Sequence, residues 1–150
     1  MMTIKEQLHH ECQRFLDDRL ATVISRIDNI QESLQSETKS SAGDKHETGR
    51  AMLQLEREKA GNQLKAIEQQ QQKLTRVPVT ATTDVVKLGS IVKTDKRNFY
   101  LAISVGELKL EDELFYGIAT ISPIGKQLIG KSVGEVAVFN SITYAIKEVL

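Results

Sequence analysis

The sequence has no tryptophan, one cysteine (Cys12) and only two prolines among its 150 residues. A single cysteine excludes an internal disulfide and is typical of a protein that works in a reducing cytoplasm. Apolar runs are short, and none approaches the ~20 residues that a membrane-spanning helix needs. The composition therefore predicts a soluble, cytoplasmic protein with no membrane partner, built as one ordinary domain or two small modules.

An excess of charge of either sign is also absent. The 20 basic and 20 acidic side chains cancel, so the net charge gives no indication of binding to nucleic acid or to an anionic membrane. The common catalytic motifs are missing as well. There is no glycine-rich phosphate loop and no serine elbow, and Ser-Pro-Ile-Gly-Lys at 122–126 lacks the glycine run and the ending of a Walker sequence. Electrostatic function must therefore rest on local clusters.

The first half of the chain has a helical pattern. One apolar stripe alternates steps of four and three at Leu16, Leu20, Val23, Ile27, Ile30 and Leu34. A thinner stripe recurs every seven residues at Leu53, Ala60, Ile67 and Leu74, with Met52 and Leu64 in support. The break at 40–43 is short, so residues 1–77 are predicted to form an antiparallel coiled coil. Its first helix would be roughly 50 Å long and must project or find a partner.

Residues 78–150 have a different pattern, with β-branched and aromatic runs between turn residues. The runs predict strands at 85–93, 99–104, 114–121, 136–139 and 142–149. A short helix is predicted over 124–129, because Ser122 can cap it, Pro123 suits its first position and Gly130 follows its end. The predicted class is α+β, a helical hairpin followed by a small, bent sheet packed on one short helix.

Two acids, Asp44 and Glu47, stand at the turn between the helical segments. An acid three residues before a glutamate at a helix start is the pattern of an N-terminal cap, and the spacing alone favours capping. A cap can also hold a carboxylate toward solvent at the end of a stiff arm, ready for delivery into a cleft. Around this pair lies a basic collar that could steady an RNA phosphate, formed by Lys39, Lys45, Arg50, Arg57 and Lys59.

Metal binding by the chain alone is disfavoured. Asp44, His46 and Glu47 fall within four residues of one turn, and ligands so close in sequence rarely converge on one tetrahedral ion. On a helix His9 and His10 diverge by about 100°. For His9, His10 and Cys12 we therefore prefer a solvated face to a metal site, although Ile4, Leu8 and Cys12 also extend the apolar stripe toward the start of the chain with looser spacing.

Several motifs, in this order, resemble the bacterial Gre family of transcript-cleavage factors. They are Gly-Asp-Lys-His-Glu-Thr at 43–48, Leu-Gly-Ser-Ile-Val at 88–92, and the stretch 118–131 followed by Gly134-Glu135. The part from Ser122 to Glu135 is the most specific. The resemblance implies an antiparallel coiled coil, an FKBP-like C-terminal domain (78–150) with a bent antiparallel sheet, and bacterial RNA polymerase as the partner whose secondary channel the coiled coil enters.

The resemblance also implies roles for single residues. Asp44 and Glu47 match the family's two acidic tip positions, which assist the polymerase in cutting backtracked RNA near its 3′ end. We expect Asp44 to complete the coordination of a Mg²⁺ shared with the polymerase, and Glu47 to orient or deprotonate the attacking water. The chain would have no cofactor of its own, would not be an enzyme by itself and would act as a monomer. Lys45 and Arg50 are expected to contact RNA, and Ser122, Pro123 and Ile124 to contact the polymerase.

Departures from the family pattern leave alternatives open. Residues 48–51 read Thr-Gly-Arg-Ala, where the family usually has Asn-Ala-Glu-Tyr, and Ala119 replaces a common serine. The chain could therefore be an inhibitor that occupies the channel without promoting cleavage. A prolyl isomerase, suggested by the FKBP-like resemblance, is disfavoured because aromatic residues are few. Dimerisation through the coiled coil is disfavoured because the two helices of an internal hairpin already bury each other's apolar stripes.

Overall fold

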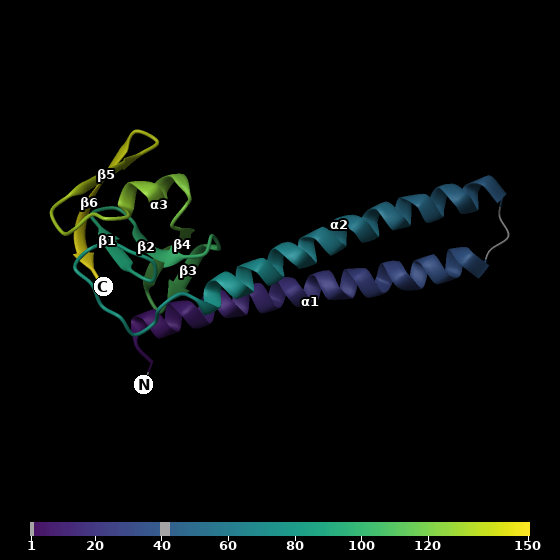
Figure 1. Ribbon diagram of the computed structural model, residues 1–150, viewed down its shortest axis with the longest axis horizontal. Helices are drawn as coiled ribbons and strands as arrows, with labels where there is room; N and C mark the ends of the chain where they lie inside the picture. Colours follow the sequence, from purple (N-terminus) through teal and green to yellow (C-terminus); the bar gives the residue numbers. More distant parts are fainter. Residues whose placement is uncertain (1, 40–42) are drawn as a thin grey trace. The chain divides into compact units, whose positions relative to one another are not determined.

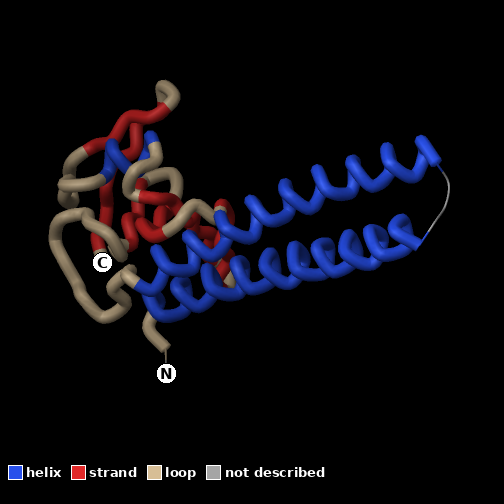
Figure 2. The backbone as a smooth tube through the Cα atoms, turned by 45° about the vertical axis from the view of Figure 1, so that its right-hand side comes forward, coloured by secondary structure: helices blue, strands red, loops and turns tan. Residues whose placement is uncertain are grey.

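The structure is a computed structural model that describes residues 2–39 and 43–150, without the side chains of residues 37–39 and 43–46. In chain order the elements are α1 (Ile4–Lys39), α2 (Gly43–Thr75), β1 (Ile91–Thr94), β2 (Asn98–Ala102), β3 (Gly106–Leu110), β4 (Glu113–Ala119), α3 (Pro123–Leu128), β5 (Val136–Phe139) and β6 (Ile142–Val149). Figures 1 and 2 show α1 and α2 side by side from two directions. The α+β class and the N-terminal helical hairpin are thus confirmed. No helix in the described ranges combines the length and apolar character needed to cross a membrane.

The chain divides into two compact units. The hairpin arm is Leu16–Gln70, and the sheet unit joins Met1–Phe15 and Gln71–Leu150. The sheet unit therefore includes the first turns of α1 and the last turn of α2. The boundary at 77/78, predicted from composition, follows the change from helix to strand, and as a domain boundary it stays a prediction.

The arm is held by one apolar stripe, as the heptad spacing predicted. Its buried members are Leu16, Val23, Ile30, Ala60 and Ile67. Met52, expected to support this seam, is instead 62% exposed. The reason is its position beside Leu53, because consecutive residues point about 100° apart around a helix and Leu53 already faces the seam.

The six strands lie in the order β3-β4-β2-β1-β6-β5. Strands β2 and β4 pair parallel, while the other pairs are antiparallel, so the sheet is mixed and not antiparallel throughout as expected. The cause is β3, a strand that the sequence interpretation missed. It is a five-residue edge strand with Glu107 and Lys109 on exposed positions, which gives only a weak strand pattern. The chain passes to the edge in β3 and returns as β4 beside β2. The FKBP-like description stays a prediction.

The strand predicted at 85–93 is wrong over most of its length. Only its last part forms β1, and Val85 makes an isolated bridge to Ser132. Between them the chain turns at Gly89, whose φ is 90°. A Cβ on Gly89 would lie 2.7 Å from the carbonyl oxygen of Pro78. Both the positive φ and the close approach require glycine here.

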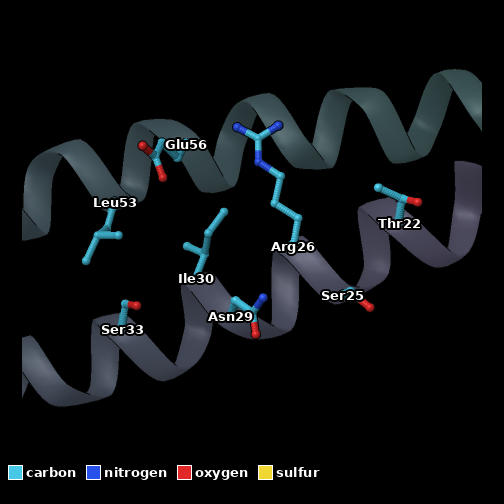
Figure 3. A pocket seen from close by; sticks show the side chains of 8 residues that line it. All are labelled: Thr22, Ser25, Arg26, Asn29, Ile30, Ser33, Leu53 and Glu56. Carbon is cyan, nitrogen blue, oxygen red and sulfur yellow. The ribbon is translucent and has the colours of Figure 1, made fainter.

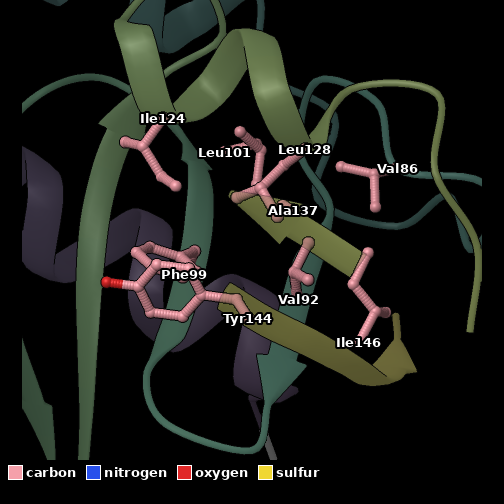
Figure 4. Close-up of a cluster of buried hydrophobic side chains, with 9 residues drawn as sticks. All are labelled: Val86, Val92, Phe99, Leu101, Ile124, Leu128, Ala137, Tyr144 and Ile146. Carbon is pink, nitrogen blue, oxygen red and sulfur yellow. The ribbon is translucent and has the colours of Figure 1, made fainter. Parts of the chain in front are cut away.

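The core of the sheet unit lies between the sheet and α3 (Figure 4). It consists of Val86, Val92, Phe99, Leu101, Ile124, Leu128, Ala137, Tyr144 and Ile146. On the other face of β2, Tyr100 is fully buried, close enough to Cys12 of α1 for the two groups to interact electrostatically. The central strand β2 is therefore covered on both faces, and the short helix that was predicted forms part of the cover.

Candidate functional site at the hairpin tip and the loop before α3

The two acids lie where the hairpin reverses. Helix α1 ends at Lys39 and α2 begins at Gly43, so Asp44 is the second residue of α2. The side chains of Asp44, Lys45 and His46 are outside the described residues. Glu47, one turn further along, is exposed. Acidic residues in the first turn of a helix are favoured by the partial positive charge of its N-terminus, so this position suits both helix stability and exposure.

Arg50 links the start of α2 to α1. Its Nη1 donates a hydrogen bond to the carbonyl oxygen of Leu34 at 3.1 Å, and the side chain is half-buried. This bond gives Arg50 a part in closing the hairpin near its tip. The RNA contacts expected of Lys45 and Arg50 stay predictions.

Below the tip the two helices leave a gap of about 400 Å³ (Figure 3). Apart from Ile30 and Leu53 its lining is polar or charged, with Thr22, Ser25, Arg26, Asn29, Ser33 and Glu56. Arg26 spans the helices, because its Nη1 donates to Oε1 of Gln63 at 3.2 Å. The arm is therefore held by polar bridges, from Arg26 to Gln63 and from Arg50 to Leu34, as well as by the thin apolar seam.

Ser122 fixes the loop that precedes α3. Its Oγ accepts a hydrogen bond from the backbone N–H of Gly125 at 3.1 Å and donates one to the carbonyl oxygen of Ala119 at 2.6 Å. Pro123 follows at the first helical position, where its missing N–H costs nothing. The predicted cap is confirmed. The hydroxyl thereby holds the loop and the helix in one fixed geometry.

The three residues expected at the polymerase surface have different surroundings. Pro123 is exposed and Ser122 is half-buried, whereas Ile124 is only 9% exposed and belongs to the core. Ile124 therefore supports the loop from beneath. Ile121, which the sequence interpretation did not single out, is 71% exposed immediately before the cap. The signal that could have found it is an isoleucine between the hydroxyl residues Thr120 and Ser122 at a helix start. The contact of this loop with polymerase stays a prediction.

The residues near the start of α1 are not the solvated face that we expected. His9 is half-buried, with its Nε2 2.9 Å from the carbonyl oxygen of Leu74, and only His10 is exposed. Cys12 is fully buried, and burial raises the pKa of its thiol to about 12. The burial of Cys12 and Leu8 follows the extended apolar stripe, whereas His9 is half-buried because its ring meets the backbone at the end of α2. Within the part of the chain that the structure describes, no three His, Cys, Asp or Glu residues are grouped to hold a metal ion.

Most aromatic side chains of the sheet unit pack in its interior or against it. Phe99 packs edge-on against Tyr144, with ring centroids 5.4 Å apart, and lies 6.4 Å from the ring of Tyr116. Phe115 is 1% exposed. Rings used in this way do not line an open pocket for a prolyl peptide, so no observation favours the isomerase hypothesis.

No protein-family model matches the chain, and no curated protein matches it. Among solved structures, the chain is similar to the crystal structure of GreA factor homolog 1 (Gfh1) of Thermus thermophilus, at 19% identity and a TM-score of 0.37, over 93% of this chain and 94% of that one. It is also similar to a structure of the transcription factor Gfh1, at 20% identity and a TM-score of 0.37, over 90% and 92% of the two chains. Likeness at this level establishes neither a family nor an activity, so function must follow from the chain's own residues.

Proposed function

We propose that this chain is an accessory factor of bacterial RNA polymerase that inserts its hairpin tip into the secondary channel and stimulates cleavage of backtracked RNA. The observation that carries the proposal is the position of the two acids. Asp44 and Glu47 lie in the first turns of α2, where two long helices reverse, and Glu47 is exposed. The likeness of residues 118–135 to the Gre family motif supports the same partner.

The dimensions of the hairpin suit delivery into a narrow channel. Helix α1 has 36 residues and α2 has 33, so at 1.5 Å per residue each is about 50 Å long. A pair of helices is roughly 20 Å wide. The seam between them needs little volume, since Ala60 is one of its fully buried members. The hairpin can therefore reach a site that a globular unit cannot enter.

Carboxylates suit the chemistry at that site. Mg²⁺ in the polymerase supplies charge stabilisation for phosphodiester hydrolysis, and carboxylate oxygens are among the ligands it prefers. Asp44 would add one such oxygen, and Glu47 would orient the attacking water or accept its proton. The polymerase would supply the other ligands, so the chain is not an enzyme by itself. Lys45 and Arg50 would contact RNA phosphates near the 3′ end.

The sheet unit would attach the factor to the polymerase. The loop held by Ser122 presents Pro123 and the exposed Ile121, with Ile124 packed beneath it. A rigid loop with an exposed aliphatic side chain loses little conformational entropy on docking. The factor would act as a monomer in this arrangement.

A channel-filling inhibitor is the second candidate. Residues 48–51 replace an acid and an aromatic of the family pattern by Arg50 and Ala51. Arg50 also bonds to the backbone of α1, which places a basic group close to the acidic tip. An inhibitor would slow transcription by the cognate polymerase and release no shortened RNA.

The double variant Asp44→Asn with Glu47→Gln separates catalysis from capping. Asparagine caps a helix about as well as aspartate, and losing two negative charges from the first turn of α2 should cost only about 1 kcal/mol, so the melting temperature should fall by only a few degrees. Cleavage of RNA in a stalled, backtracked complex should be lost. The matched control is Glu58→Gln with Glu68→Gln, which removes two exposed acids from the shaft of α2 and should cleave like the parent.

The outcomes discriminate between the candidates. If the double variant cleaves as fast as the parent, the catalytic assignment of the tip acids is wrong. If the parent slows transcription and yields no cleaved RNA, the inhibitor is correct and the cleavage factor is not.

A further inference from the structure

A second pocket lies within the sheet unit, far from the tip in sequence. It has a volume of about 340 Å³ and is formed where the first turn of α1 meets the segment after α2 and the end of the chain. Ile4, Val79, Ile91 and Leu150 contribute apolar walls, and Lys5 lies among them. A volume near the lower end of the roughly 300–1,000 Å³ typical of ligand sites suits a small molecule.

Lys5 is the unusual member of this lining. The residue is only 8% exposed, although it carries an ammonium group. Its Nζ donates a hydrogen bond to the carbonyl oxygen of Ala81, in the segment that forms one wall of the pocket. An ammonium has three donors, and this bond uses one. In residues 2–39 and 43–150 no carboxylate forms an ion pair with Lys5.

The surroundings of Lys5 do not neutralise its positive charge. Burial lowers the pKa of Lys5, and the positive charge of Lys87 lowers it further. The nearby carboxylate of Glu6 has another task, because its Oε1 accepts from the Thr3 hydroxyl at 3.1 Å while the Thr3 Oγ1 accepts from the Glu6 N–H at 3.2 Å. That exchange caps α1. Burying an ammonium group that has unused hydrogen-bond donors costs folding free energy unless an anion pairs with it.

We propose that this pocket binds a small aliphatic monocarboxylate, with its carboxylate on Lys5 and its hydrocarbon chain against Ile4, Val79 and Ile91. One buried ammonium matches a single negative charge, and the partial positive charge at the N-terminus of α1 adds to it. The mostly apolar walls favour a hydrocarbon tail over a bare anion. The pocket does not involve Asp44 or Glu47, so this site is independent of the function proposed for the tip.

Hexanoate is a suitable probe, titrated into the full chain and followed by amide chemical shifts. We expect saturable shifts at residues 4–6 and 79–82. Hexanol has the same tail without the charge, hexylamine reverses the charge, and acetate and inorganic phosphate lack the tail. Each should bind at least about tenfold more weakly than hexanoate, because each loses either a charge-assisted hydrogen bond or the apolar contact.

Two variants complete the test. Lys5→Met keeps most of the apolar stem of the side chain and removes the charge, so hexanoate should bind about tenfold more weakly or not at all. Lys126→Met, an exposed lysine on α3, is the matched control and should bind like the parent. The proposal is overturned if hexanoate causes no saturable shifts, if hexanol, acetate or phosphate binds as tightly, or if Lys5→Met keeps the parent affinity. Should Lys5→Met fail to fold, the series of probes on the parent protein decides.

Discussion

In the hairpin arm the buried side chains form a single stripe between two helices, whereas in the sheet unit the central strand β2 is covered on both faces. Phe99 and Leu101 of β2 face the core with α3, and Tyr100 between them is fully buried beside Cys12. The arm even leaves a gap of about 400 Å³ between its helices, lined mostly by polar residues. The difference fits the proposed function, in which the arm would need reach with little width and the sheet unit would need a rigid docking surface.

The largest expected contrast comes from removing one leucine in each unit. Leu101→Ala opens a cavity in a core where Leu101 is fully buried and should cost about 3 kcal/mol of unfolding free energy. Leu53→Ala, at a half-buried position that lines the gap, should cost about 1 kcal/mol because little new cavity forms. All 3 tyrosines, at 100, 116 and 144, lie in the sheet unit, so tyrosine fluorescence in urea follows that unit and helical circular dichroism follows the arm. Equal costs in the two units would refute the comparison.

Replacing a glycine by alanine should change the unfolding free energy in opposite directions in the two units. A Cβ on Gly125 would lie 2.2 Å from the carbonyl oxygen of Ala119, so Gly125→Ala should destabilise the sheet unit by about 2 kcal/mol or more. A Cβ on Gly61 would meet only the end of the flexible Arg57 side chain at 3.0 Å. Gly61→Ala should therefore stabilise the arm by about 1 kcal/mol, the difference in helix propensity. Thermal unfolding of both variants checks the signs, and a destabilised Gly61→Ala would mean that the seam is tighter there than the structure indicates.

A smaller expected effect is a loss of stability of the sheet unit at low pH, which depends on Asp95. The Asp95 carboxylate accepts a hydrogen bond from the backbone N–H of Ala145 at 2.8 Å, joining the β1–β2 turn to β6. That bond, and then the neighbouring Lys96, lower the pKa of Asp95 below its ordinary 3.8. A lowered folded-state pKa means that the stabilisation is complete above pH 3.8 and is lost as the pH falls through the folded-state pKa.

Asp95→Asn keeps an acceptor oxygen but cannot titrate, so its stability should lack this acid-dependent component. An NMR titration of the Asp95 carboxyl carbon measures the shift directly. A midpoint at or above 3.8 would show that the bond to Ala145 does not hold the turn in solution.

Features that depend on local pattern could be predicted from the sequence. The heptad positions Val23, Ile30, Ala60 and Ile67 are buried as the spacing requires, and the strands at 136–139 and 142–149 have the predicted bounds because turn residues flank them. Features that depend on distant segments could not be predicted. His9 is half-buried because its ring meets the carbonyl oxygen of Leu74 in α2, and Ile124 is buried although its neighbour Ile121 is exposed. Nothing in the local pattern separates these two isoleucines.

The candidate site divides in the same way. The exposure of Glu47 follows from its place at a helix start between two stripes, and the cap by Ser122 follows from the order Ser-Pro. The bond from Arg50 to Leu34 joins residues in different helices, so it needs the register of the hairpin, which the break at 40–43 does not determine. The pocket around Lys5 combines four separate segments and has no sequence signature.

The central claim is that the tip acids act on RNA inside the polymerase, and the rate of RNA cleavage in a stalled, backtracked complex tests it most directly. The account predicts that the parent and the shaft control Glu58→Gln with Glu68→Gln shorten the RNA at the same rate, while Asp44→Asn with Glu47→Gln gives only the rate of polymerase alone. Equal cleavage by all three proteins would contradict it.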